Sequence, residues 1–416
     1  MQQQTKHLTN SFASQNEAYG IIIFLFWPFL AFIYACTDFS NKINRIIIIA
    51  FFALYGLTFY VNPVMDGQRR VDSFERMYSE PFENLYNTFD TLYEETLDFV
   101  ELVIMYSVSR FSDFYGVLFA VYALIFGGLM LHYLKVFYKY YTFNPNPNTV
   151  LFFILLVCAN FISNINGFRM WFAAWVFAVG VLKYLHKPNY IFVLLSACSI
   201  LVHFSFLPVV GLFVIYTVVK NWPKIYGILA IITFFMAELN IQKLQQYAAI
   251  FGSASEKKIN AYTGEEYIET VSELAGQGAW YIELIKNGLK YFVLFSLAVI
   301  FIKTRGHFKT KVMANFYSFT LLLLSFANIS SLVPSGGRFY TVFNIFAFST
   351  ILLYYVYEFT EKKITSVNKI GVPIVGLYVV FTFRLFSDSA SLYLIGPTFF
   401  MHNAFIENVS LQSFIF

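Results

Sequence analysis

Three side chains with cationic or titratable groups stand where long apolar runs of this sequence begin or end. Arg169 lies in "NINGFRMWFAAW", His203 in "ILVHFSFLP" and Arg338 in "VPSGGRFYTVF". An ionised group beside an apolar run is costly unless it faces water, a partner or a ligand. The paired N–H donors of two arginine guanidinium groups match phosphate oxygens, and a histidine suits proton transfer near neutral pH.

Each of these residues also has an ordinary structural explanation. A single arginine at a helix end often extends to lipid headgroups, and a histidine in an apolar run is often a hydrogen-bonded interior residue. Gly336 and Gly337 before Arg338 allow either close approach to a ligand or only a tight turn. The functional interpretation therefore depends on all three residues lying at one level of the membrane.

Acidic side chains are frequent between residues 63 and 113, and most of them suit a solvated loop. Asp72, which precedes Tyr78, and the pair Asp98 and Glu101 are better placed to reach an active cavity. The spacing of Asp98 and Glu101 puts both carboxylates on one face of a helix. Asp72, Asp98 and Glu101 are therefore candidate catalytic carboxylates.

The composition indicates which elements must position these residues. The chain has 416 residues, of which 58% are hydrophobic and 12% charged, whereas soluble domains average about 25% charged residues. Apolar runs recur along the whole length, which predicts an all-α polytopic membrane protein with one membrane domain, residues 1–416. The first run has no cleavage pattern behind it and is expected to be a retained helix.

Segments of about 20 apolar residues cross a bilayer, and the sequence predicts twelve of them. They are 19–37, 46–62, 114–134, 149–165, 168–186, 190–204, 206–219, 224–239, 288–303, 312–333, 339–357 and 370–387. The pair 190–204 and 206–219 forms one apolar run that "HFSFLP" interrupts, so the run is divided there.

The distribution of basic residues orients this layout. If the loop "DFSNKINR" is cytoplasmic, alternation places fifteen of the 28 basic residues but only three of the 24 acidic residues inside. This asymmetry agrees with the positive-inside rule. Arg169, His203 and Arg338 then share the outer level. Both termini and two long loops, 63–113 and 240–287, also face outward.

Two segments outside the spans have membrane character. The stretch from Thr91 to Ser107 has helical apolar spacing but is too short to span, which predicts a membrane-surface helix in the first long loop. The C-terminal stretch 389–416 is apolar but broken by Gly396 and Pro397. It is expected either to lie in the interface or to re-enter the membrane.

Several function classes lack their signatures. The sequence has no nucleotide-binding glycine loop, no GxSxG and no HExxH motif. Its six histidines are scattered and its three cysteines lie in apolar runs, so neither a metal site nor a disulfide framework is expected. The spans carry almost no acids, which argues against ion-coupled transport, and no basic nucleic-acid patch is present.

The segments around the candidate residues resemble a known family. "NGFRMWFAAWVFAVGVLKYLHK", the later "LVHFSFLP", the late "GGRFYTVFNIF" and the upstream "RRVDSFERMY" look like the EpsG/Wzy-type bacterial polysaccharide polymerases, which are GT-C-like membrane glycosyltransferases. The resemblance covers about Asp66 to Tyr357. "YEETLDFVELV" departs from the family pattern, which is less acidic there, so no family role carries over to Asp98 or Glu101.

The resemblance implies an enzyme of the bacterial inner membrane that acts on the periplasmic face. It would join oligosaccharide repeat units carried on undecaprenyl pyrophosphate into an O-antigen, capsule or exopolysaccharide. Arg169 and Arg338 would hold the pyrophosphate, and His203 would take the acceptor proton or orient the leaving group. This reaction requires no cofactor and no metal.

The matching segments also supply candidates for substrate contact, namely Asn166, Tyr78 and Tyr340. Expected partners are the lipid-linked oligosaccharides, membrane lipids, and other polysaccharide-export and chain-length proteins. Three alternatives stay open: another GT-C-like ligase or polyprenyl-phosphate-dependent glycosyltransferase, a lipid-linked sugar transporter, and a membrane acyltransferase. Polar groups gathered on the outer side argue against the last two, because a transporter needs a pathway to both faces and acyltransferase histidines tend to face the cytosol.

Overall fold

The computed structural model describes residues 18–38, 41–63, 66–81, 84, 98–141, 146–236, 280–331, 335–359 and 363–415. Within these residues the chain is helical, and an isolated bridge between Ser391 and Ser410 is its one strand-like pairing. The all-α fold that the composition predicts is therefore confirmed for the described part of the chain.

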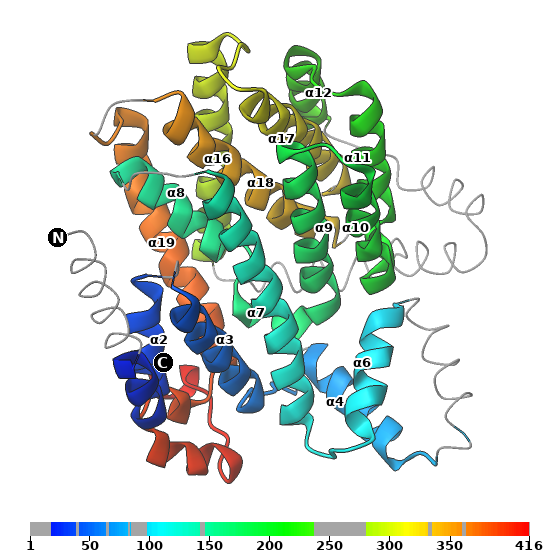
Figure 1. Ribbon diagram of the computed structural model, residues 1–416, viewed down its shortest axis with the longest axis vertical. Helices are drawn as coiled ribbons and strands as arrows, with labels where there is room; N and C mark the ends of the chain where they lie inside the picture. The colour runs from blue at the N-terminus through cyan, green and yellow to red at the C-terminus, as the bar shows by residue number, and fades with distance from the viewer. Residues whose placement is uncertain are drawn as a thin grey trace, which may run out of the picture.

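The helices form a bundle with a smaller group of helices at one end (Figure 1). The first elements are α2 (Pro28–Cys36), α3 (Lys42–Leu57), α4 (Asp66–Ser79) and α6 (Phe99–Ser109). The middle of the chain forms α7 (Tyr115–Tyr140), α8 (Pro147–Cys158), η2 (Ile162–Gly167), α9 (Phe168–His186), α10 (Tyr190–Val202), η3 (Phe204–Phe206), α11 (Leu207–Val219) and α12 (Pro223–Phe235). The last elements are α16 (Trp280–Thr304), α17 (Lys311–Ser330), η5 (Gly336–Arg338), α18 (Phe339–Tyr357), α19 (Ser366–Ser389), η6 (Leu392–Leu394), η7 (Thr398–Phe405) and α20 (Gln412–Ile415).

Six segments of the described chain are long and apolar enough to cross a membrane. They are Tyr115–Tyr140, Pro147–His186, Tyr281–Thr304, Lys311–Ser330, Gly336–Tyr357 and Ser366–Ser389. Helices α10, α11 and α12 are apolar but have 13 residues each, which is a rise of about 20 Å against a hydrocarbon core of about 30 Å. Each of the twelve predicted segments contains a helix, but twelve spans are not confirmed.

The apolar run from residue 190 to 219 is divided where "HFSFLP" predicts. His203 ends α10 with an extended backbone, at φ −151° and ψ 113°. The short helix η3 follows, and α11 starts with a proline in its first turn, a position that lacks a hydrogen-bond partner for the amide anyway. The break leaves His203 in a non-helical turn at the end of α10.

Helices α9 and α10 pack closely because of one glycine. A Cβ added at Gly180 would lie 2.3 Å from the Ser196 hydroxyl and 2.7 Å from the Phe192 carbonyl oxygen. Small residues of this kind let membrane helices approach backbone to backbone. The antiparallel pair therefore fixes the start of α9, which carries Arg169, beside the end of α10.

The first long loop, residues 63–113, contains two helices. Helix α6 begins after Asp98 and runs to Ser109, so it covers the second part of the predicted surface helix, and residues 91–97 lie outside the described chain. Helix α4 was not expected. Figure 1 shows α4 and α6 together at one end of the bundle, and α6 packs against α4, α7 and α10.

The remaining predicted boundaries differ modestly. Helix α16 begins at Trp280, so the last part of the predicted loop 240–287 belongs to this helix, and residues 240–279 lie outside the described chain. The C-terminal stretch forms short helices that contact the first apolar segment: the Trp27 indole donates to the Ile395 carbonyl at 2.6 Å, and the Thr398 hydroxyl to the Leu25 carbonyl at 2.7 Å.

Candidate functional site

Arg169 bridges two carboxylates that precede or start α6. Its Nη1 atom lies 2.8 Å from Asp98 Oδ2, and its Nε atom lies 3.0 Å from Glu101 Oε2. Asp98 precedes α6 with an extended backbone instead of lying on the helix as the spacing predicts, yet both carboxylates face one guanidinium. Charge-assisted hydrogen bonds of this length are among the strong ones in proteins, so this contact fixes α6 against the start of α9.

Asp98 also holds the turn that contains His203. Its Oδ2 atom lies 3.0 Å from His203 Nδ1, and its Oδ1 atom accepts from the Phe204 amide at 3.0 Å. The carboxylate contacts both the ring and the backbone, so it determines the position and orientation of the imidazole. If Nδ1 carries the proton, Nε2 is left as a proton acceptor.

A second arginine, Arg70 of α4, joins the cluster formed by Asp98, Glu101, Arg169 and His203. Arg70 Nε lies 2.7 Å from Glu101 Oε1, and its Nη1 atom donates to the Asn166 carbonyl at 2.7 Å and to the Asp66 carbonyl at 3.0 Å. The Tyr122 hydroxyl approaches Glu101 Oε1 at 3.4 Å. Glu101 therefore pairs with two arginines, and the backbone just before α9 is tied to α4.

The cluster has a buried side and an accessible side. The side chains of Asp98, Glu101 and Arg70 are 1%, 7% and 7% exposed, whereas those of His203 and Arg169 are 16% and 29% exposed. The two buried carboxylates are balanced by the buried Arg70 and by the part-exposed Arg169, as buried charges require. The histidine and Arg169 are therefore the members that a substrate can reach.

Local sequence explains how each side chain reaches the cluster. Helix α4 buries Gly67, Arg70, Val71, Phe74 and Met77, which recur at helical spacing on one face. A Cβ at Gly67 would lie 2.6 Å from the Asn166 amide oxygen, so this glycine lets α4 approach η2. Tyr122 is held by Phe168, whose ring stacks on it at 3.9 Å between centroids.

Arg338 lies in a different environment from Arg169. It ends η5, is exposed, and within the described residues its guanidinium makes no hydrogen bond or ion pair. The next residue, Phe339, packs on Phe206 with ring centroids 5.7 Å apart, and Phe206 closes the turn that starts at His203. The His203 and Arg338 segments are thus in contact, although no bond joins their charged groups.

The other candidate residues from the sequence do not join the carboxylates of this cluster. Asp72 and Tyr78 are exposed on α4, where Asp72 accepts a hydrogen bond from Gln68 at 2.8 Å. Asn166 takes part through its backbone carbonyl, which Arg70 contacts. The Tyr340 hydroxyl donates to Asn328 Oδ1 at 2.7 Å, away from the carboxylates. The structure therefore brings together Asp98, Glu101, Arg169 and His203, and it leaves Asp72 and Tyr78 outside their contacts.

Sequence reasoning missed Arg70, Tyr122 and the Phe204 amide. Arg70 had a signal: it occupies an apolar-face position of an amphipathic helix, where an arginine needs a buried partner. Tyr122 and the Phe204 amide had none, because their roles depend on contacts with a distant segment. Among the described residues no group of histidine, cysteine and acidic side chains has a metal-binding arrangement.

Comparison with known families gives a match over most of the chain. The model of the EpsG family matches residues 67–396, which is more than three quarters of the chain and includes every member of the cluster except the Asp66 carbonyl. No curated protein and no solved structure matches the chain.

Proposed function

Because the chain belongs to the EpsG family, we propose that it is a polysaccharide polymerase that joins lipid-linked repeat units on the outer face of the bacterial inner membrane. The family suggests a glycosyltransferase-like polymerase in polysaccharide biosynthesis. The observation that supports a specific mechanism is the double role of Asp98, which contacts Arg169 and His203 through the same oxygen. In this proposal His203 is the proton acceptor and lies beside the Arg169 cation at the accessible side of the cluster.

The proposed step is displacement of a pyrophosphate at a sugar carbon. A hydroxyl at the non-reducing end of the acceptor unit forms a bond to the first carbon of the donor chain, and the bond from that carbon to the pyrophosphate oxygen breaks. The hydroxyl proton moves to His203 Nε2, and the electron pair leaves with the undecaprenyl pyrophosphate. General-base assistance of this kind contributes about 10²- to 10⁴-fold in rate.

The cations stabilise the charge that develops on the leaving group. Arg169 lies beside His203, and Arg338 lies on the segment that packs against the same turn through Phe339 and Phe206. Arg338 has no carboxylate partner among the described residues, which leaves its guanidinium N–H donors available for phosphate oxygens. In this proposal Arg169 acts close to the reacting carbon, and Arg338 binds the outer part of the pyrophosphate.

The buried part of the cluster supports this arrangement without touching substrate. Arg70 and Glu101 hold Arg169 and the start of α9 in place, and Asp98 orients the imidazole. Efficient transfer needs catalytic groups that stay within about half an ångström of their productive positions, and supporting contacts of this kind hold them there. Arg70, Glu101 and Asp98 are therefore positioning residues in this proposal.

A reconstitution experiment tests the proposed reaction. Lipid-linked repeat units isolated from cells that lack this protein are added to liposomes that contain the purified full chain. A ladder of products, each one repeat unit longer than the last, is the expected result. Transfer of a single unit, or of a glycan onto a different lipid, would contradict polymerisation and favour a ligase. Movement of unchanged units across the bilayer would favour a transporter.

A further inference from the structure

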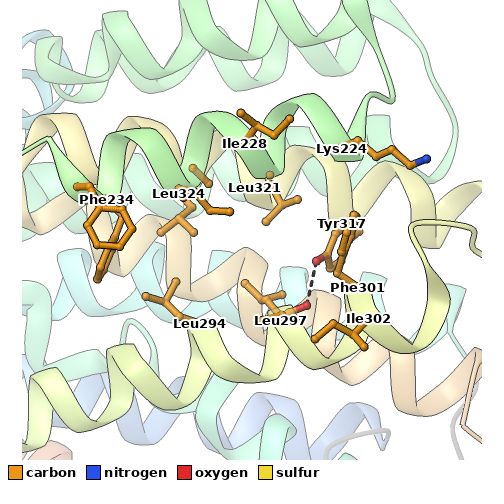
Figure 2. A pocket seen from close by; sticks show the side chains of 15 residues that line it. Lys224, Ile228, Phe234, Leu294, Leu297, Phe301, Ile302, Tyr317, Leu321 and Leu324 are labelled. Carbon is orange, nitrogen blue, oxygen red and sulfur yellow. Dashed lines mark hydrogen bonds between the residues drawn. The ribbon is translucent and has the colours of Figure 1, made fainter.

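An apolar groove runs between α12, α16 and α17. Its volume is about 500 Å³. Figure 2 shows the side chains that line it, with Phe234 near one end and Lys224 near the other. Between them the lining is hydrocarbon, including Ile228, Leu294 and Leu297, and Tyr317 contributes a ring whose hydroxyl is bonded to the Leu297 carbonyl at 2.9 Å. The groove therefore offers hydrocarbon contacts along its length and few polar ones.

The groove has the length and access that suit a lipid chain. From Lys224 to Phe235, α12 rises about 16 Å, about half the hydrocarbon thickness of a bilayer. Ile228, Ile231 and Phe235 on this helix line the groove and are 58%, 61% and 75% exposed, so the groove is open on an apolar outer surface of the bundle. If the groove were empty, the side chains that line it would lose dispersion contacts. A lipid chain that enters from the open side can supply these contacts.

A cation marks the end of the groove nearest the candidate site. Lys290 Nζ lies 5.4 Å from the centroid of the Phe234 ring, which lines the groove, and 4.4 Å from that of Tyr340. The position of Tyr340 is fixed by Asn328, whose amide donates to the Ala230 carbonyl at 3.2 Å and to the Thr233 hydroxyl at 3.1 Å. These bonds join α12, α17 and α18 around the mouth of the groove.

The mouth is continuous with the segment that carries Arg338. Tyr340 belongs to the first turn of α18, two positions after Arg338, and Phe339 between them packs on Phe206. A chain in the groove with an anionic head at Lys290 would therefore direct that head toward Arg338 and the His203 turn. Two cations along one path fit a pyrophosphate better than the single phosphate of an ordinary phospholipid.

We propose that this groove binds the polyprenyl chain of the lipid-linked donor, with Lys290 at its mouth contacting the first phosphate. This inference rests on the proposed polymerase function and adds a binding site for the lipid part of its substrate. Tyr340, a sequence candidate for substrate contact, acts here by holding Lys290 at the mouth through its ring.

The test measures binding and turnover separately, with undecaprenyl pyrophosphate as the probe. Ala298→Trp fills the groove from α16, and Lys290→Gln removes the charge at its mouth. The matched controls are Ile232→Trp, which places the same side chain on an exposed position of α12 outside the groove lining, and Lys286→Gln, which removes an exposed charge one turn before Lys290 on the same helix. Full-length proteins in detergent are compared after thermal unfolding confirms that they are folded.

The expected result is at least tenfold weaker binding of undecaprenyl pyrophosphate by Ala298→Trp and Lys290→Gln, and unchanged binding by both controls. A probe with a photoreactive group in its chain should label α12 or α16 in the native protein. Equal binding by Ala298→Trp and the native protein, or displacement of the probe by ordinary phospholipid at equal concentration, would overturn the inference. If the native protein forms a product ladder and Ala298→Trp binds undecaprenyl pyrophosphate normally, the groove inference is rejected and the polymerase proposal stands. If the groove binds the probe but no ladder forms, the polymerase proposal is rejected and the groove remains a lipid-binding site.

Discussion

Asp98 Oδ2 contacts Arg169 Nη1 at 2.8 Å and His203 Nδ1 at 3.0 Å. One carboxylate oxygen thus joins a cation from the start of α9 to a titratable ring from the end of α10, across 71 and 105 positions of sequence. The same residue accepts the Phe204 amide through its other oxygen. This relationship makes Asp98 the residue on which the geometry of the accessible site depends.

Replacing Asp98 tests that dependence. Asp98→Asn keeps the shape but removes the charge and presents an amide that can donate toward the ring. We expect polymer formation to fall about 100-fold, in line with the loss of an orienting partner. The measurement is the rate of ladder formation from lipid-linked units. Asp72→Asn, in an exposed residue of the same loop, is the control and should keep near-native activity; equal effects of the two substitutions would contradict the assignment.

The buried ion pair of Arg70 and Glu101 predicts a difference between neighbouring arginines. Arg70→Ala leaves Glu101 with one of its two cationic partners, and breaking a buried pair typically costs about 3–5 kcal/mol. Arg69→Ala, one position earlier, removes an arginine that is 86% exposed and lies 3.6 Å from Asp66, a surface contact that contributes about 0–1 kcal/mol. Thermal unfolding in detergent should therefore show a clear destabilisation for Arg70→Ala only. Similar unfolding temperatures for the two variants would contradict a structural role for Arg70.

A substitution at Arg338 can test the paired donors of the guanidinium group without removing the positive charge. Arg338→Lys keeps one positive charge but loses the paired donors that grip a phosphate. Because Arg338 is exposed and holds no carboxylate within the described residues, the substitution should leave stability unchanged while impairing polymerisation severely. Polymer yield and unfolding temperature are measured on the same preparation. Native yield from Arg338→Lys would indicate an arginine that only reaches lipid headgroups.

Impermeant thiol reagents test the orientation of the chain. The native cysteines, Cys36, Cys158 and Cys198, are first replaced. We expect a cysteine at position 255 to be labelled from outside the cell membrane and one at position 307 to be labelled only after permeabilisation, because basic residues near 305–311 predict a cytoplasmic loop. The opposite labelling would place Arg169 and His203 on the cytoplasmic side.

Sequence periodicity predicted the elements better than their contacts. Helix α9 runs from Phe168 to His186, the predicted bounds, and the chain breaks at His203 as "HFSFLP" indicates. The length of α16 was underestimated because Glu283, Lys286 and Asn287 interrupt its apolar pattern at the beginning. The predicted twelve spans are not confirmed: six segments of the described chain are long and apolar enough to cross, and for helices of 13 residues such as α10, α11 and α12 apolar character alone does not show a crossing.

The site was predictable in its residue types but not in its pairing. The sequence placed Asp98 and Glu101 on one helix face, and it singled out Arg169 and His203 for their position beside apolar runs. It could not show that Asp98 contacts both of them, because that contact joins segments far apart in the chain. For Arg70, its position on the apolar face of an amphipathic helix indicates a buried partner, but not which one, since Glu101 lies 31 positions away.

In the proposed reaction, His203 takes the proton of the acceptor hydroxyl during transfer between lipid-linked units. His203→Gln tests it most directly, because the glutamine amide can still donate to Asp98 but cannot accept a proton at neutral pH. The measurement is the rate of ladder formation by full-length protein in liposomes, together with binding of undecaprenyl pyrophosphate. We expect a loss of about 100-fold or more in rate with unchanged binding; a native rate of ladder formation from His203→Gln would show that His203 is not the proton acceptor.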